Sequence, residues 1–276
     1  AFELSGNTGL RINHFLQTGQ GDIEQILKES HFFINSMEML DFIKWLKQYN
    51  DKFDRKINLY GFDIQSNIDL VEDILKFYQQ TDKSAEKLAA TLLKTLADNN
   101  MNSYWDYPPA LQDSVRKMIY VLEEKHSLNK KDYRLKACYI EYEYLAKRIE
   151  VLSNQLTMNN SGYGQALLMR DSCNAHLIKW IKDFEGENSK IILFAHNGHL
   201  GKSLSFYPRV RTLSTQGFYE YTPQELITGY YLNEIFNDKY YFIGTQFGSG
   251  FFMGFDPEND YTLSKLEVTN PELNSF

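Results

Sequence analysis

The sequence predicts an α/β fold with a mainly parallel central sheet flanked by helices, and with a helical insertion. Three observations predict it: four short apolar runs recur along the chain, helical patterns separate them, and one long strandless stretch divides the pattern in two. Strands that alternate with helices over short connectors are typical of βαβ units. A chain of 276 residues suits one large domain or two small ones with a sizeable core.

The first two predicted strands lie in the N-terminal part of the chain. Residues 1–4 are expected to be the end of a strand, which a Ser-Gly-Asn turn follows. Residues 57–63 are expected to form a second strand that ends in Asp63. Polar N-cap residues and apolar residues at helical spacing predict helices between these strands, at residues 10–17, 22–29 and 36–49.

A helical insertion is expected next, because residues 66–160 carry no persistent strand signal. Its clearest pattern runs from Leu135 to Leu156, where apolar residues alternate spacings of three and four. Such a heptad seam predicts one long helix over residues 135–156, packed in coiled-coil fashion or in the main core. We interpret the stretch as an insertion, and a candidate lid, in a catalytic core formed by residues 1–65 and 161–276.

The α/β pattern resumes after the insertion. We expect a helix near residues 164–184, a strand at 190–195, a helix near 223–236 and a strand at 240–245. A last apolar run at residues 251–255 follows a Gly-Ser-Gly turn and suits an antiparallel edge strand. The strands of the parallel sheet should all end at one edge.

The third of these strands ends in the most informative segment of the chain. Residues 191–199 read Ile-Ile-Leu-Phe-Ala-His-Asn-Gly-His, so an apolar run stops at two histidines three residues apart. Open α/β sheets bind ligands at the carboxyl ends of their strands, which places His196 and His199 where a site is expected. Histidine can act there as an acid, a base, a donor or a metal ligand. Two polar turn residues are the alternative interpretation.

Each of the first two predicted strands also carries a carboxylate in or at the end of its apolar run. Glu3 interrupts an apolar strand, and Asp63 closes the next one. A buried carboxylate is costly unless it is paired. Alone, Glu3 could be an exposed residue on a frayed end, and Asp63 could cap the following helix. Together with the two histidines they predict acids and imidazoles at one edge of one sheet, with Asn197 in a supporting position.

Composition restricts the partners of the protein. The formal charge is −7, without a basic cluster, which argues against nucleic acid. Every apolar run falls well short of the ~18 residues of a membrane span, so no membrane association is expected. Cys138 and Cys173 lack a CxxC spacing and predict no disulfide framework. The lack of a signal-peptide pattern favours a cytoplasmic protein, with export left open because the chain starts inside an expected strand.

Two other chemistries have partial signals in the sequence. The Gly248-Ser249-Gly250 segment lacks the strand-to-helix elbow that a hydrolase serine needs. The His-x-x-His spacing with nearby acids could bind zinc, but the sequence has no HExxH helix and no cysteine near the histidines. A metal-dependent hydrolase that uses His196 and His199 with Glu3 or Asp63 remains an alternative.

Several segments, in this order and spacing, resemble the erythromycin esterase family, which also includes succinoglycan-biosynthesis-like proteins. The closest likeness is Ala195-His196-Asn197-Gly198-His199, which is similar to the family's AHN.H signature. The family's Gly-Phe-Asp strand end and Arg-Asp helix are also matched. The similar segments cover most of the chain outside the helical insertion, at residues 1–16, 40–50, 60–65, 169–171, 229–232 and 240–245.

The resemblance implies a hydrolase that opens the macrolactone ester of 14-membered macrolides such as erythromycin. Histidine-activated water would do so, without a metal, a cofactor or a covalent nucleophile. It implies active-site positions for Glu3, His196 and His199. We expect Asp63 and Asn197 to bind the substrate or to support these residues. The family's presumed base is a histidine in an upstream Gly-Glu-x-x-His-Gly segment, and this chain starts after it, so His196 would carry more of that role. A member without macrolide activity, in polysaccharide biosynthesis or polyketide binding, is the alternative from another class.

Overall fold

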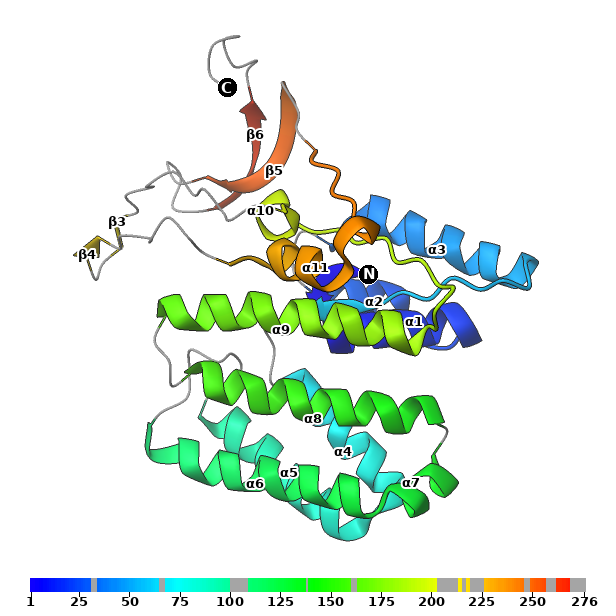
Figure 1. Ribbon diagram of the computed structural model, residues 1–276, viewed down its shortest axis with the longest axis vertical. Helices are drawn as coiled ribbons and strands as arrows, with labels where there is room; N and C mark the ends of the chain where they lie inside the picture. The colour runs from blue at the N-terminus through cyan, green and yellow to red at the C-terminus, as the bar shows by residue number, and fades with distance from the viewer. Residues whose placement is uncertain are drawn as a thin grey trace. The chain divides into compact units, whose positions relative to one another are not determined.

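The chain divides into two units, Ala1–Tyr240 and Tyr241–Phe276. In the first unit, a mostly helical α/β architecture contains small sheets (Figure 1). The computed structural model describes residues 1–30, 34–64, 68–99, 109–137, 139–159, 163–202, 213–214, 217–218, 226–245, 249–256 and 262–268.

The first unit contains a parallel pair of strands, β1 (Phe2–Ser5) and β2 (Gly61–Asp63). The segment before the two histidines joins β1 at one point, where Phe194 forms an isolated parallel bridge. Two backbone hydrogen bonds of 2.9 Å make this bridge, from Glu3 N–H to the Phe194 carbonyl and from Phe194 N–H to the Ala1 carbonyl. The predicted α/β class is therefore present, but its sheet is smaller than the sequence predicts.

The predicted strand at residues 240–245 is not formed. Tyr240 is buried, and its hydroxyl donates a 2.6 Å hydrogen bond to the Leu200 carbonyl. The side chains of Tyr241 and Ile243 are instead 82% and 84% exposed. An apolar run predicts a strand only if its side chains find a surface to cover, and the side chains of Tyr241 and Ile243 stay largely exposed.

The predicted antiparallel strand at residues 251–255 is confirmed as β5 (Gly250–Asp256) in the second unit. It pairs along its whole length with β6 (Thr262–Val268). A further short antiparallel pair, β3 (Leu213–Ser214) with β4 (Gly217–Phe218), belongs to the first unit.

In the described part of the chain between β1 and β2, three helices form, as the sequence predicts. Each begins after a polar N-cap residue whose side chain accepts a backbone N–H: Ser5 from Thr8 at 3.1 Å, and Asp22 and Ser36 in the same way. The helices are α1 (Gly6–Thr18), α2 (Ile23–Lys28) and α3 (Met37–Lys52).

A close approach of backbones fixes α1 against β2. A Cβ atom on Gly9 would lie 2.0 Å from the amide nitrogen of Gly61, and one on Gly61 would lie 2.1 Å from the Ser5 carbonyl oxygen. Both positions therefore require glycine. This packing sets the two strand ends that carry Glu3 and Asp63 beside each other.

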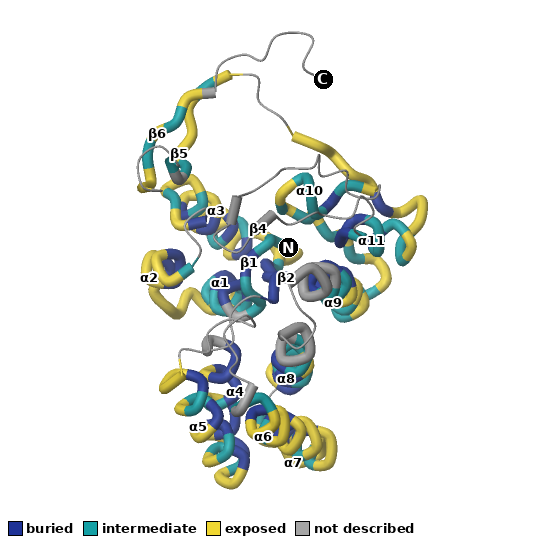
Figure 2. The backbone as a smooth tube through the Cα atoms, turned by 90° about the vertical axis from the view of Figure 1, so that its left-hand side faces the viewer, coloured by how far each residue is buried: buried dark blue, intermediate teal, exposed yellow. Residues whose placement is uncertain are grey.

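The described part of residues 66–160 is helical and contains no strand, as predicted. Its helices pack around their own apolar core, and Figure 2 marks buried stretches on α4, α5 and α8. They are α4 (Ile68–Thr81), α5 (Lys83–Asp98), α6 (Pro109–Leu128), α7 (Lys130–Lys136) and α8 (Tyr139–Asn159).

The single long helix predicted over residues 135–156 is wrong in its first turn. The chain leaves α7 at Ala137, whose backbone is extended, and α8 starts at Tyr139. Leu135, the first residue of the predicted seam, is 79% exposed on α7. The break allows α7 to turn so that Tyr133 is buried and bonds Asp82 at 2.7 Å. The seam residues Tyr142, Leu145, Ile149 and Leu152 are buried.

The remaining helices lead to the two histidines. The long helix α9 (Tyr163–Phe184) lies between α8 and the layer that holds α1 and α11 (Figure 1). The short helix α10 (Asn197–Leu200) contains His199, and α11 (Thr228–Phe236) runs into a 3-10 turn, η2 (Asn237–Lys239). Among the described residues, no helix is long and apolar enough to cross a membrane.

Candidate active site

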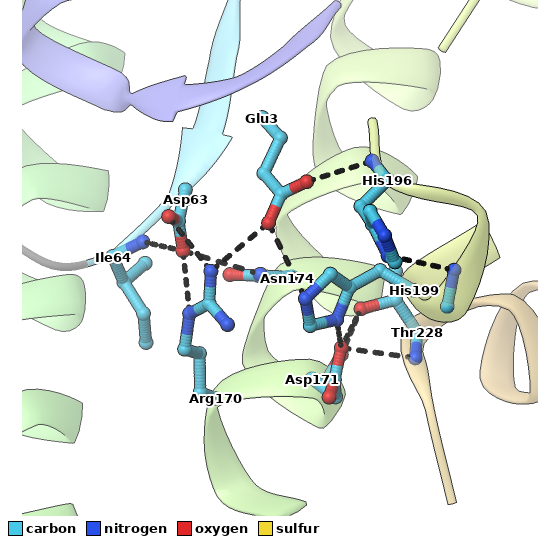
Figure 3. Close-up of polar contacts among 10 residues, drawn as sticks. Glu3, Asp63, Ile64, Arg170, Asp171, Asn174, His196, His199 and Thr228 are labelled. Carbon is cyan, nitrogen blue, oxygen red and sulfur yellow. Dashed lines mark hydrogen bonds and ion pairs between the residues drawn. The ribbon is translucent and has the colours of Figure 1, made fainter. Parts of the chain in front are cut away.

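The carboxylates and histidines predicted at the strand ends lie together in the structure (Figure 3). Glu3 comes from β1, Asp63 from the end of β2, and His196 and His199 from the turn after residues 190–195. Helix α9 adds charged residues to this group from its N-terminal half.

Arg170 of α9 links the two carboxylates. Its Nε and Nη2 donate to both oxygens of Asp63 at 2.8 and 2.9 Å, and Nη2 also donates to Glu3 Oε1 at 3.2 Å. The side chains of Arg170 and Asp63 are only 7% and 5% exposed. Burial opposes the charge of Arg170, but the adjacent carboxylates outweigh it and raise its pKa. The bidentate geometry fixes the position of Asp63 as well as compensating its charge.

His199 lies between two carboxylates. Its Nδ1 is 2.9 Å from Asp171 Oδ1, and its Nε2 is 3.4 Å from Glu3 Oε1. Burial lowers the pKa of His199, but the hydrogen bond to Asp171 and the charges of Asp171 and Glu3 outweigh that effect and raise it. Because an acid faces each ring nitrogen, the arrangement favours the imidazolium form with a proton on both nitrogens.

Thr228, at the start of α11, holds Asp171 in place. The Thr228 amide donates to Asp171 Oδ1 at 3.2 Å, and its hydroxyl also contacts Oδ1. Helix α11 can reach this position because it packs directly on α10, where a Cβ atom on Gly229 would lie 2.2 Å from the Gly201 carbonyl oxygen. The orientation of His199 therefore depends on three segments of the chain.

His196 is exposed and is held through its backbone and one ring nitrogen. Its amide donates to Glu3 Oε2 at 3.0 Å, and its Nδ1 accepts the Gly198 N–H at 3.0 Å. A ring nitrogen that accepts a hydrogen bond carries no proton, so the neutral imidazole is protonated on Nε2. The rings of His196 and His199 are 6.3 Å apart. Both histidines are thus arranged as hydrogen-bond donors.

The geometry suits stabilisation of negative charge. Two imidazole donors backed by fixed carboxylates can hold an oxyanion that develops on a bound substrate. A metal site would need at least three convergent ligands. Among the described residues, no group of three or more His, Cys, Asp or Glu side chains is arranged to hold a metal ion.

Sequence reasoning found four members of this cluster and missed the residues that orient them. Asn197 begins α10, and its supporting role stays a prediction. The missed residues are Arg170, Asp171 and Thr228. The Arg170-Asp171 pair had a signal, since it belongs to the segment matched in the resemblance, but charged residues on a helix usually face solvent. Thr228 had none, because its contact with Asp171 spans 57 positions in the sequence.

Comparisons place these observations among known proteins. The family model for erythromycin esterase matches residues 1–276. Similar solved structures include a succinoglycan biosynthesis protein (TM-score 0.75, 16% identity, 98% of this chain and 62% of that one) and a Bacillus cereus protein (0.74, 19%, 98% and 63%). A third is a mutant of the erythromycin esterase EreC in its open conformation. It has a TM-score of 0.65 and 18% identity, over 97% of this chain and 67% of that one. No curated protein matches the chain.

At 16–19% identity the likeness to the solved structures shows the fold. The chain also spans less than two thirds of the first two solved relatives, at 62% and 63% of their length.

Proposed function

The chain belongs to the erythromycin esterase family, and on that premise we propose that it is a carboxylic ester hydrolase acting on the macrolactone of 14-membered macrolides. The observation that supports the proposal most is the position of His199 between Asp171 and Glu3. A paired imidazolium beside a second imidazole donor suits a reaction in which an ester carbonyl gains negative charge.

The proposed reaction places the ester carbonyl oxygen against the Nε2–H of His196 and beside the Nε2–H of His199, whose contact with Glu3 Oε1 is long at 3.4 Å. Attack of water on the carbonyl carbon gives a tetrahedral oxyanion, which these donors stabilise. When the carbon–oxygen bond to the ring breaks, His199 is placed to donate a proton to the leaving alkoxide. Glu3 contacts His199 and the backbone of His196, so we assign it a positioning role.

Neither His196 nor His199 is assigned the role of the base that takes a proton from water. His196 Nδ1 already accepts a hydrogen bond from Gly198, and both nitrogens of His199 face carboxylates. Neither histidine therefore has a lone pair directed at water. The family resemblance assigns this step to a histidine of a Gly-Glu-x-x-His-Gly segment, which does not occur in these 276 residues.

We also propose that residues 190–195 continue the parallel sheet beside β1. The bridge at Phe194, with its two hydrogen bonds of 2.9 Å, supports this arrangement. A strand there would fix His196 at its carboxyl end, where α/β sheets bind ligands.

The proposal is tested by incubating the chain with erythromycin and following the gain of one water by mass spectrometry, with and without added imidazole. Imidazole can act as the base in place of a missing side chain. We expect His199→Gln and His196→Gln to lower the rate by about 10²–10³-fold each, since each removes one donor to the oxyanion. His14→Gln, at an exposed position of α1, is the matched control.

Three outcomes would count against the proposal. Unchanged rates in both histidine variants would contradict the role of His196 and His199 as donors to the oxyanion. Loss of activity on dialysis against EDTA, restored by one stoichiometric metal ion, would favour a metallohydrolase using His196 and His199 with Glu3 or Asp63. A lack of macrolide hydrolysis in the presence of imidazole would favour a family member with another substrate, such as an ester in polysaccharide biosynthesis.

A further inference from the structure

A small apolar cavity lies between the helical region and the strands, apart from the histidines. Its volume is 40 Å³, and it is lined by residues of β2, α1, α4, α8 and α9. Asp63 is the one residue of the candidate active site that also lines it, whereas Glu3, His196 and His199 do not. Most of its wall is aliphatic or aromatic, including Leu177 and Trp180 of α9.

Arg148 of α8 brings a poorly compensated positive charge to this apolar wall. Its side chain is 17% exposed, and its ion pair with Asp73 is a long one, 3.4 Å from Nη2 to Oδ2. The Nε of Arg148 is buried and has no hydrogen-bond partner among the described residues. Burial lowers the pKa of Arg148 even though Asp73 opposes this effect. A buried donor without a partner is costly, so an acceptor from outside the chain would be favourable.

The neighbouring Lys147, unlike Arg148, has a close carboxylate partner. Its ammonium group is already paired with Glu150 at 2.6 Å and lies 5.8 Å from the centre of the Trp180 ring. The charge available to a ligand is therefore the guanidinium, which prefers a planar carboxylate that accepts from Nε and an adjacent Nη together. The apolar wall selects a ligand whose remaining atoms are hydrocarbon.

We propose that this cavity binds a monocarboxylate with an unbranched apolar tail, and that Arg148 holds its carboxylate. The site is independent of the proposed hydrolase reaction. By volume the cavity holds about three water molecules, at roughly 10–15 Å³ each, which suits a carboxylate group with its first carbons. A second cleft of 150 Å³ shares Lys147, Val151 and Leu177 with the cavity and lies between α8 and α9. It gives the tail a path toward solvent.

The experiment is isothermal titration calorimetry of the 276-residue chain with the sodium salts of acetate, butyrate, hexanoate and octanoate. Burial of hydrocarbon predicts that affinity rises by about fourfold for each methylene group until the second cleft is filled. Hexanamide, which has the same shape without the charge, is expected to bind at least tenfold more weakly than hexanoate. Equal binding of the acid and the amide would overturn the proposal.

Matched variants locate the site. Arg148→Met should weaken hexanoate binding at least tenfold, whereas Arg116→Met, at an exposed position of α6, should leave it unchanged. Val151→Phe fills the space shared by both cavities and should block binding while it retains Arg148, which covers the case in which Arg148→Met does not fold. Unchanged affinity in Val151→Phe, or in a folded Arg148→Met, would overturn the proposal. So would a crystal grown with hexanoate that shows only ordered water at Arg148.

Discussion

At the scale of single residues, the charge of His199 depends on Asp171. The carboxylate accepts from Nδ1 and helps to raise the pKa of the imidazole. Asp171→Asn removes the negative charge but keeps the shape. We expect the pKa of His199, measured by NMR titration, to fall in this variant.

The same substitution should change the pH profile of hydrolysis. A raised pKa keeps the imidazolium donor present as the pH increases, and activity is lost as the pH passes through that pKa. In Asp171→Asn the loss should therefore begin at lower pH. Asp183→Asn, an exposed position on the same helix, is the control. A pH profile that does not move would contradict a role for Asp171 in setting the charge of His199.

Arg170 compensates two buried carboxylates, which makes it the most sensitive residue of the cluster. Arg170→Met leaves Asp63 without its bidentate partner and Glu3 without one of its donors. Breaking a buried pair by removing one partner costs about 3–5 kcal/mol, and we expect a loss of this size in urea unfolding. Adding Asp63→Asn should recover part of the loss. A loss below ~1 kcal/mol would mean that the pair is screened like a surface ion pair.

The predictability of the cluster differs between its residues. Glu3, Asp63, His196 and His199 follow from local patterns, because each interrupts or ends an apolar run. The role of Asp171 depends on contacts with Thr228 and His199 that only the folded chain creates. A single sequence has no periodicity that pairs such positions.

At the scale of secondary-structure elements, the contact of α1 with β2 sets the geometry of the strand ends. Gly9→Ala would place a Cβ atom 2.0 Å from the amide nitrogen of Gly61, and backbone cannot move aside as a flexible side chain can. We expect a loss of several kcal/mol, beyond the ~1–3 kcal/mol that overpacking typically costs. Gly201→Ala, whose Cβ would meet its nearest atom at 3.6 Å, should be close to neutral. Equal thermal unfolding midpoints for Gly9→Ala and Gly201→Ala would disprove the close contact between α1 and β2.

Helix α6 buries a histidine that should make the helical region sensitive to acid. His126 is 4% exposed, stacks on Tyr142 with ring centres 4.1 Å apart, and has no hydrogen-bond partner for either ring nitrogen among the described residues. Burial lowers its pKa from 6.5 to about 4. The neutral form is thus favoured in the folded state, so stability is present above pH 6.5 and is lost as the pH falls toward 4.

His126→Phe should remove this loss. The ring keeps its stacking on Tyr142 but cannot be protonated, so the variant should be more stable at low pH by on the order of 3 kcal/mol. Guanidinium unfolding at a series of pH values measures the difference. His14→Phe, at an exposed position, should retain the acid sensitivity of the parent. An unaltered pH dependence in His126→Phe would show that the ring is solvated in the native state.

Element types were predicted better than element ends. The heptad seam identifies α8, because the same periodicity buries its residues from Tyr142 to Leu152 in the helical core. It does not show the break at Ala137. There the chain buries Tyr133 and leaves Leu135, the first apolar residue of the seam, exposed. Strands are harder still, since a run such as residues 240–245 becomes a strand only beside a partner.

At the scale of the whole molecule, the first unit contains separate apolar cores. One core joins α4 to α8 through residues such as Leu92 and Leu145, and another joins β1 to α1–α3 through residues such as Ile43. The two share no buried residue among those that the structure describes. We propose that residues 66–160 form an insertion with its own cooperative stability, as the strandless pattern in the sequence suggests.

Leu92→Ala and Ile43→Ala test this division, because both side chains are fully buried in different cores. Truncating a buried aliphatic side chain typically costs about 2–5 kcal/mol. If the cores are separate cooperative units, Leu92→Ala should speed hydrogen exchange mainly in α4–α7, and Ile43→Ala mainly in α1 and α3. Helix α8 packs on both the helical core and α9, so it should respond partly to each type of change. Equal acceleration throughout Ala1–Tyr240 in both variants would instead mean that the insertion and the strands unfold as one body.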